Sequence, residues 1–183
     1  MIAPGVEHRV EPSTDAVFFV QFYREPGANI IPGMTPKPVG HRGGAWEHRG
    51  RDLDTIGEIL EMVTRQYVDI VQDDMLEPYF NVNPGFIDWQ AHIGAVAGYW
   101  NHVVLLAPDY EVDIIEHHRP LHHRVPFTPE LFDRWLQIFH DTIDGGWTGP
   151  VAHTAKRRAT GMAWAMAQRF LGHGVWHPKP EWR

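Results

Sequence analysis

Residues 55–71 read TIGEILEMVTRQYVDIV and carry the signals of an amphipathic helix. Thr55 followed three residues later by Glu58 is the pattern of a capping box at a helix N-terminus. Apolar residues then recur at steps of three and four, as on one face of a helix: Ile56, Ile59, Leu60, Val63, Tyr67, Ile70 and Val71. The stretch therefore predicts a long helix with Tyr67 on its apolar face.

The same spacing predicts three more long helices downstream. A turn at Asn83-Pro84-Gly85 precedes the second, which covers residues 89–104. Caps, prolines and glycines mark the boundaries that follow: Pro108 after the second helix, Thr128-Pro129 and Gly145-Gly146 around the third, and Pro150 and Gly172 around the fourth. A short helix is expected over residues 111–118, ending there or restarting at Pro120, because proline disrupts a helix interior.

These elements predict an all-α domain, since no alternating strand pattern follows residue 50. The 183-residue length and 43% hydrophobic content fit one globular domain. We expect an irregular Pro/Gly-rich N-terminal arm over residues 1–50, a helical domain over 51–174 and a C-terminal tail over 175–183.

Charge and composition exclude several classes of function. The formal net charge of -7 and the lack of a basic run argue against nucleic-acid binding. No apolar stretch reaches the length of about 18 residues that a membrane helix needs. No pattern typical of a signal peptide begins the sequence, so a cytoplasmic location is expected.

Histidine is the candidate ligand residue, because the chain has 13 histidines and no cysteine. Four of them lie in one stretch, residues 116–123, EHHRPLHH. Imidazole nitrogen suits haem iron, zinc or non-haem iron. A solvated surface segment is one interpretation. A zinc hydrolase is another, because His118 and His122 are four apart, but the sequence lacks the neighbouring glutamate and Pro120 disrupts the helix.

The third interpretation is an axial histidine of a haem, and it gains from three residues on the long helices. Tyr67 and His92 lie on the apolar faces of the first and second helices, and Trp135 lies on that of the third. A plain core would prefer leucine at such positions. Each residue alone is more often structural, but the three together indicate a pocket with polar groups opposite an imidazole.

From Thr55 to Gly172 the chain resembles the truncated haemoglobins, and most closely their group III branch. Four patterns appear in the family's order: Tyr67 before Pro78-Tyr79-Phe80, His92 three residues after Trp89 and before Tyr99-Trp100, Tyr110 before the short helix, and Phe132 ahead of Trp135-Leu136. The resemblance implies a two-over-two helical sandwich that holds haem b.

The resemblance also implies roles for single residues. Counting on from Tyr110 makes His118 the proximal iron ligand, whereas counting back from Trp135 favours His122, which stays an alternative. Tyr67, His92 and Trp135 would line the distal side. The remaining cofactor contacts expected are Phe80, Val96, Ile114, Arg119 and Phe139. Arg119, Arg124 and His123 are candidates to pair with the haem propionates.

A haem of this kind binds O2, NO, CO or peroxide at its open sixth position. The expected role is oxygen handling or detoxification of reactive nitrogen or oxygen species, with peroxidase or NO dioxygenase activity and a reductase as partner among the options. The competing hypothesis is a globin-fold interaction or sensor protein without haem. A Soret band distinguishes the two.

Overall fold

The computed structural model describes residues 50–80, 88–108 and 110–182. Within these ranges it contains six α-helices and one 3-10 turn. The helices are α1 (Ile56–Ile70), α2 (Glu77–Phe80), α3 (Trp89–Leu105), α4 (Ile114–Arg124), α5 (Pro129–Gly146) and α6 (Pro150–Phe170), and the turn is η1 (Pro180–Trp182). The all-α prediction is confirmed. Two predicted segments lie outside the described residues: the turn Asn83-Pro84-Gly85 and, except for Gly50, the arm over residues 1–50.

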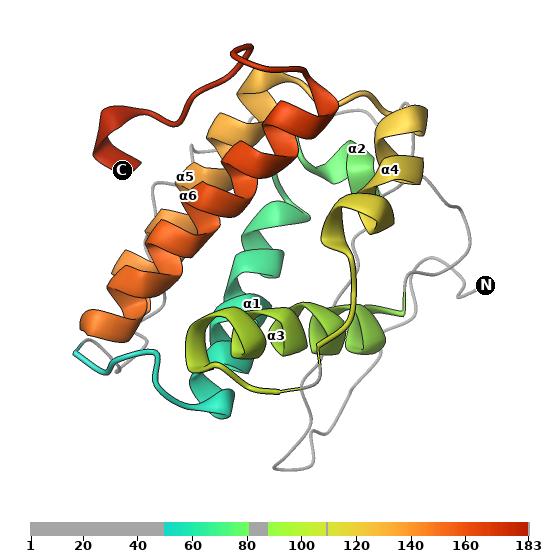
Figure 1. Cartoon of the computed structure of the whole chain (residues 1–183). Helices are drawn as coiled ribbons and strands as arrows, with labels where there is room; N and C mark the ends of the chain where they lie inside the picture. The colour runs from blue at the N-terminus through green and yellow to red at the C-terminus, as the bar shows by residue number, and fades with distance from the viewer. Residues whose placement is uncertain (1–49, 81–87, 109, 183) are drawn as a thin grey trace, which may run out of the picture. The chain divides into compact units, whose positions relative to one another are not determined.

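The four long helices form two contacting pairs. Helix α1 packs across α3, and α5 packs beside α6 (Figure 1). The pairs are joined by contacts of α1 with α5 and of α3 with α6. Helix α4 contacts α6. This is the expected two-over-two arrangement.

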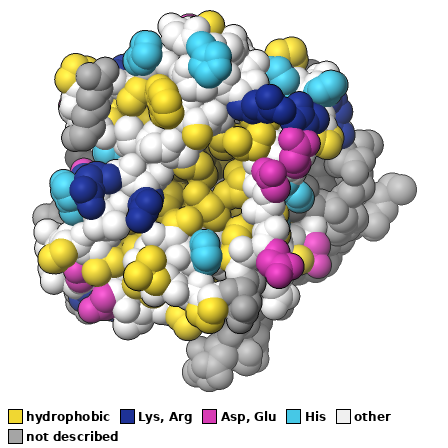
Figure 2. Space-filling view, in the orientation of Figure 1, with side chains coloured by type: hydrophobic (Ala, Val, Ile, Leu, Met, Phe, Trp, Pro, Cys, Tyr) yellow, Lys and Arg dark blue, Asp and Glu magenta, His cyan; other side chains and the backbone are white. Residues whose placement is uncertain are grey.

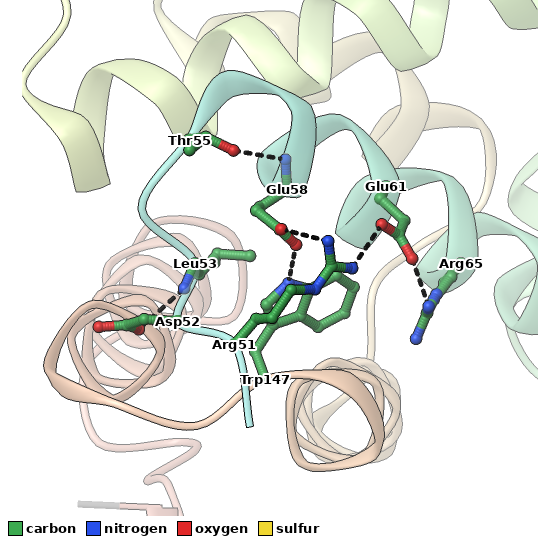
Figure 3. Close-up of polar contacts among 8 residues, drawn as sticks. All are labelled: Arg51, Asp52, Leu53, Thr55, Glu58, Glu61, Arg65 and Trp147. Carbon is green, nitrogen blue, oxygen red and sulfur yellow. Dashed lines mark hydrogen bonds and ion pairs between the residues drawn. The ribbon is translucent and has the colours of Figure 1, made fainter. Parts of the chain in front are cut away.

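Local capping explains where α1 and α5 begin. Thr55 Oγ1 accepts a hydrogen bond from the Glu58 N–H at 3.1 Å, and Thr128 Oγ1 accepts one from the Leu131 N–H at 3.3 Å. Both predicted caps are therefore confirmed. The Glu58 side chain does not complete a capping box. Its carboxylate instead pairs with Arg51 Nη1 at 2.6 Å and accepts from the indole N–H of Trp147 (Figure 3).

Helix α6 is capped by a residue from far away in the sequence. The Asp52 carboxylate accepts hydrogen bonds from the N–H groups of Val151 at 3.0 Å and Ala152 at 2.8 Å. Gly149 permits this approach, because a Cβ there would lie 2.5 Å from the Asp52 carboxylate and its φ is +144°. A hydrogen bond of 2.9 Å from Thr148 N–H to Arg51 O fastens the same two segments.

The short helix differs from the prediction. It begins at Ile114, after Asp113 caps it through the Glu116 N–H at 3.1 Å, and it runs through Pro120 to Arg124. Proline removes the hydrogen bond to the Glu116 carbonyl. Glu116 and Pro120 are both exposed, so water can hydrate that carbonyl. The predicted end at His118 is therefore wrong.

The buried face of α1 is rotated from the predicted stripe. Ile56 and Leu60, which the sequence placed on the apolar face, are 68% and 45% exposed. Met62 and Gln66 are buried in their place. The buried face of α1 spans Ile59 to Ile70 and packs on α3 and α5. The polarity of the residues does not identify this face, because it is set by the helices that α1 contacts.

The C-terminal tail packs on the domain. Trp176 and Trp182 are each 5% exposed. The Trp176 indole donates to Asp133 Oδ1 at 2.9 Å, and the Thr160 hydroxyl donates to the Trp182 carbonyl at 2.8 Å. The tail thus covers α5 and α6 and closes with η1.

Candidate haem pocket

Tyr67 and His92 meet between α1 and α3. The Tyr67 hydroxyl lies 2.9 Å from His92 Nε2, within hydrogen-bond distance. The Phe80 and Trp89 rings complete the cluster, with centroids 5.7 Å and 6.1 Å from the Tyr67 ring. The sequence predicted that Tyr67 and His92 share a pocket, and the fold brings them into direct contact.

Both members of this pair are neutral at neutral pH. Burial raises the pKa of Tyr67, and burial together with the nearby His117 and His118 lowers the pKa of His92. A neutral phenol and a neutral imidazole each carry one donor proton. One donor is used in the mutual hydrogen bond, and among the described residues no partner takes the other, which is therefore available to a ligand or to water.

Trp135 lies in a second aromatic group. Its ring stacks on Phe139 with centroids 5.4 Å apart, and Phe139 stacks on Trp100 at 4.6 Å. Phe139 is fully buried and Trp135 half-buried. Among the described residues the Trp135 indole has no hydrogen-bond partner, whereas Tyr67 and His92 have each other.

His118 has the protonation state that an axial ligand needs. Its Nδ1 lies 2.7 Å from the carbonyl oxygen of Ile114, one turn earlier in α4. A carbonyl only accepts, so Nδ1 carries the proton and Nε2 keeps its lone pair. Metal-ligating histidines are commonly oriented by this kind of hydrogen bond. Burial lowers the pKa of His118, which keeps the ring neutral.

His122 has the opposite tautomer. The backbone N–H of Phe127 donates to its Nδ1 at 3.1 Å. An accepting Nδ1 places the proton of the neutral ring on Nε2, which then has no lone pair for a metal. The ring is also wedged between Phe127 and Phe170, with both centroids 5.0 Å away. The two candidate histidines therefore differ in chemistry although they are one turn apart.

A groove of about 400 Å³ opens between α3, α4 and α6. Its size is within the usual range for small-molecule and cofactor sites. The walls are mostly apolar: Tyr99 and Val103 from α3, Ile114 and Ile115 from α4, and Met162 and Met166 from α6, with Arg157 and Arg158 beside them. Figure 2 shows apolar side chains in a central hollow with basic side chains on both sides.

The other predicted cofactor contacts are placed as follows. Ile114 lines the groove, Phe80 belongs to the Tyr67 cluster, and Val96 is half-buried on α3. Arg119 has a partner of its own, because its Nε donates to Glu116 Oε2 at 2.8 Å.

Sequence reasoning missed Arg157 and Arg158, which line the groove from α6. The run Lys156-Arg157-Arg158 was the available signal. It was overlooked because α6 was interpreted only through its apolar stripe, of which Met162 and Met166 line the same groove.

A zinc centre requires several protein ligands that converge. In the ranges that the structure describes, no group of three or more His, Asp or Glu side chains is arranged to hold a metal ion. None of the helices in those ranges is long and apolar enough to cross a membrane.

Comparison with known proteins identifies the class of this fold. The crystal structure of group III truncated hemoglobin from Campylobacter jejuni matches with a TM-score of 0.58 at 22% identity, over 66% of this chain and 94% of that one. No family model matches the sequence. The fold is that of the truncated haemoglobins.

A sequence match narrows the class. The group 3 truncated hemoglobin ctb of Campylobacter jejuni is 27% identical over 93 residues, which are 50% of this chain and 68% of that protein. The chain is a homologue of the group III truncated haemoglobins, in sequence and in fold.

Proposed function

We propose that this protein holds haem b through His118 and binds a diatomic gas, O2, NO or CO, next to Tyr67 and His92. The observation that carries the proposal is the hydrogen bond from His118 Nδ1 to the Ile114 carbonyl, which leaves Nε2 with its lone pair. The charge of His118 helps to lower the pKa of His92, so the two rings lie close enough to interact electrostatically.

The surroundings fit a macrocycle with apolar faces. Ile114, one turn before His118, lines the groove together with Tyr99 and Met162. When bound, haem iron with one axial imidazole supplies an open coordination position for a diatomic ligand. The groove walls offer apolar surface to the cofactor.

The chain's own residues determine how long a ligand stays. The spare donor of the Tyr67–His92 pair stabilises a ligand that carries partial negative charge, and this slows its release. Trp135, expected on the distal side, offers an indole N–H as a second donor. Slow release favours sequestration or redox chemistry over rapid delivery. We therefore favour detoxification of reactive nitrogen or oxygen species in the cytoplasm, with an electron-donating reductase as partner.

The decisive experiment compares His118→Gly with His122→Gly as a matched control on the same helix. Both purified proteins are titrated with haemin, with and without free imidazole. We expect a wild-type-like Soret band for His122→Gly. For His118→Gly we expect weak haem binding and an altered band that added imidazole restores.

The reverse pattern, with loss in His122→Gly and none in His118→Gly, would make His122 the ligand. Wild-type protein that acquires no Soret band would instead establish the alternative, a globin-fold interaction or sensor protein without haem. Zinc in such a protein without that band would indicate the metallohydrolase.

A further inference from the structure

A histidine of α5 is buried beneath the C-terminal tail. His140 is 8% exposed, and among the described residues its Nε2 has no hydrogen-bond partner. The ring of Trp182, in η1, lies beside it, with the two centroids 6.1 Å apart. The backbone of Lys156, in α6, forms a hydrogen bond with the other ring nitrogen. His140 is therefore enclosed between two helices and the tail, with one ring nitrogen unpaired.

Burial decides the protonation state of this ring. It is the largest cause that lowers the pKa of His140, and the Lys156 ammonium lowers that pKa further. The carboxylates of Asp141 and Asp144 and the Lys156 carbonyl act in the opposite direction, and burial outweighs them. Lys156 is itself paired with Asp144, at 2.5 Å. From the described part of the tail, the group that faces the ring is the uncharged indole of Trp182. The closed tail thus fits the neutral ring.

The end of the tail, residues 177–182, is held by few polar contacts among the described residues. The Thr160 hydroxyl donates to the Trp182 carbonyl at 2.8 Å, and Lys179 Nζ lies 4.7 Å from the centroid of the Trp182 ring. Lys179 also lies 3.6 Å from Asp133 Oδ2, in a part-exposed ion pair. Chain ends with few buried contacts open locally at a small free-energy cost, whereas α5 and α6 are joined by extensive contacts. The tail is therefore the side from which water can reach His140.

Protonation makes the ring unsuited to this site. It adds a charge and a second N–H donor where Nε2 has no acceptor, and burying such a group is unfavourable. We propose that the charge of His140 controls whether the tail is closed: residues 177–182 cover the neutral ring, and its protonation releases them. This inference does not depend on haem. Because the closed form holds the ring neutral, the tail is closed above the ordinary histidine pKa of 6.5 and opens as pH falls below it.

A spin label on the tail tests this proposal. The chain has no cysteine, so Glu181→Cys creates a single labelling site, at an exposed residue of η1. The electron paramagnetic resonance spectrum of an attached nitroxide then reports the mobility of the tail at each pH. The labelled protein is compared with its His140→Gln variant, in which the side chain is neutral at every pH. His173→Gln is the matched control, because it removes an exposed histidine near the start of the tail. A separate label at Leu60→Cys, on α1, shows whether the helices stay folded.

We expect the ratio of mobile to immobile label on the tail to rise as pH falls from about 7.5 to about 5, by at most about tenfold per pH unit, as one proton allows. The rise should be absent in His140→Gln and present in His173→Gln, while the label on α1 stays unchanged. An equal rise in His140→Gln, or a tail label that stays immobile throughout, would overturn the inference.

The reciprocal measurement decides the case if the tail of His140→Gln is mobile at every pH. Opening of the tail and protonation of the ring are linked, so loosening the tail must bring the pKa of His140 closer to 6.5. We expect this shift in Trp182→Ala, in which the ring that covers His140 is removed. Titration of the histidine ring protons by NMR measures it, and the same pKa in wild type and variant would overturn the inference.

Discussion

Replacing Asp52 by alanine should uncap α6 and destabilise the whole domain. The Asp52 carboxylate accepts the N–H groups of Val151 and Ala152, at 3.0 Å and 2.8 Å, and also that of Leu53 at 2.8 Å. These two helix N–H groups have no carbonyl partner within α6, as is general for a first turn. The variant leaves them to solvent and removes a negative charge from the positive end of the helix dipole.

The expected loss can be estimated from the hydrogen bonds. Substituting alanine for an N-cap residue costs about 0.5–2 kcal/mol. Asp52 is charged, half-buried and serves two helix donors, so we expect the upper end, about 2 kcal/mol. In a chain of 183 residues this corresponds to a fall in Tm of about 4–8 °C.

The effect should also depend on pH. Burial alone would raise the pKa of Asp52, but the hydrogen bonds from Val151, Ala152 and Leu53 outweigh it and lower the pKa below the ordinary 3.8. A lowered pKa stabilises the folded protein above the ordinary value, and the stabilisation is lost as pH falls through the folded-state pKa. The difference between wild type and Asp52→Ala should therefore be full at neutral pH and shrink in acid.

Urea and thermal unfolding followed by circular dichroism measure these differences. Asp54→Ala is the control, because Asp54 is exposed two residues away, and its effect should stay within about 0.5 kcal/mol. Gly149→Ala tests the same contact from the other side. Its Cβ would collide with the Asp52 carboxylate, so it should cost less stability in the Asp52→Ala background than in wild type. A Tm unchanged in Asp52→Ala, or costs that simply add, would refute the capping argument.

Two further predictions concern the pocket and a buried histidine. Tyr67→Phe removes the hydrogen bond of 2.9 Å to His92. We expect CO and O2 to dissociate from the haem-loaded variant about two- to tenfold faster, which corresponds to the free energy of one hydrogen bond. Flash photolysis and stopped-flow mixing measure these rates, and unchanged rates would exclude Tyr67 from ligand stabilisation. Burial, and then the Lys156 ammonium, lower the pKa of His140 below 6.5. Its contribution to stability is thus present above that pH and lost as pH falls, so unfolding titrations of His140→Leu should show a flatter decline in acid than wild type, and parallel curves would contradict this.

The long helices were predictable because their determinants are local. Thr55 and Thr128 each cap the helix that the sequence assigned to them, and Gly172 follows the end of α6. These signals act within three or four residues, so a linear pattern contains them. The Tyr67–His92 contact was predictable for a related reason, since each residue interrupts an apolar face and two such faces pack together.

The determinants that escaped prediction are all non-local. Asp52 caps a helix that begins far along the chain, and no sequence pattern near Pro150 indicates this cap. Gln66 is polar yet 1% exposed, because α1 packs against both α3 and α5. Arg157 and Arg158 are identified as residues of a groove only because α3 and α4 supply its other, apolar walls.

The choice between His118 and His122 shows why the site needed the structure. Helical spacing puts both on one face of α4, and counting from either flank gives a different answer. The two rings differ because His122 lies in the last turn of α4 and His118 does not. The His118 ring shares the Ile114 carbonyl, which has a second lone pair available inside the helix. The His122 ring, in the last turn, reaches instead the free N–H of Phe127 just beyond the helix. An acceptor next to one ring and a donor next to the other leave opposite nitrogens protonated. The position of the α4 C-terminus, which Pro120 made ambiguous in the sequence, thereby determines which imidazole has a lone pair on Nε2.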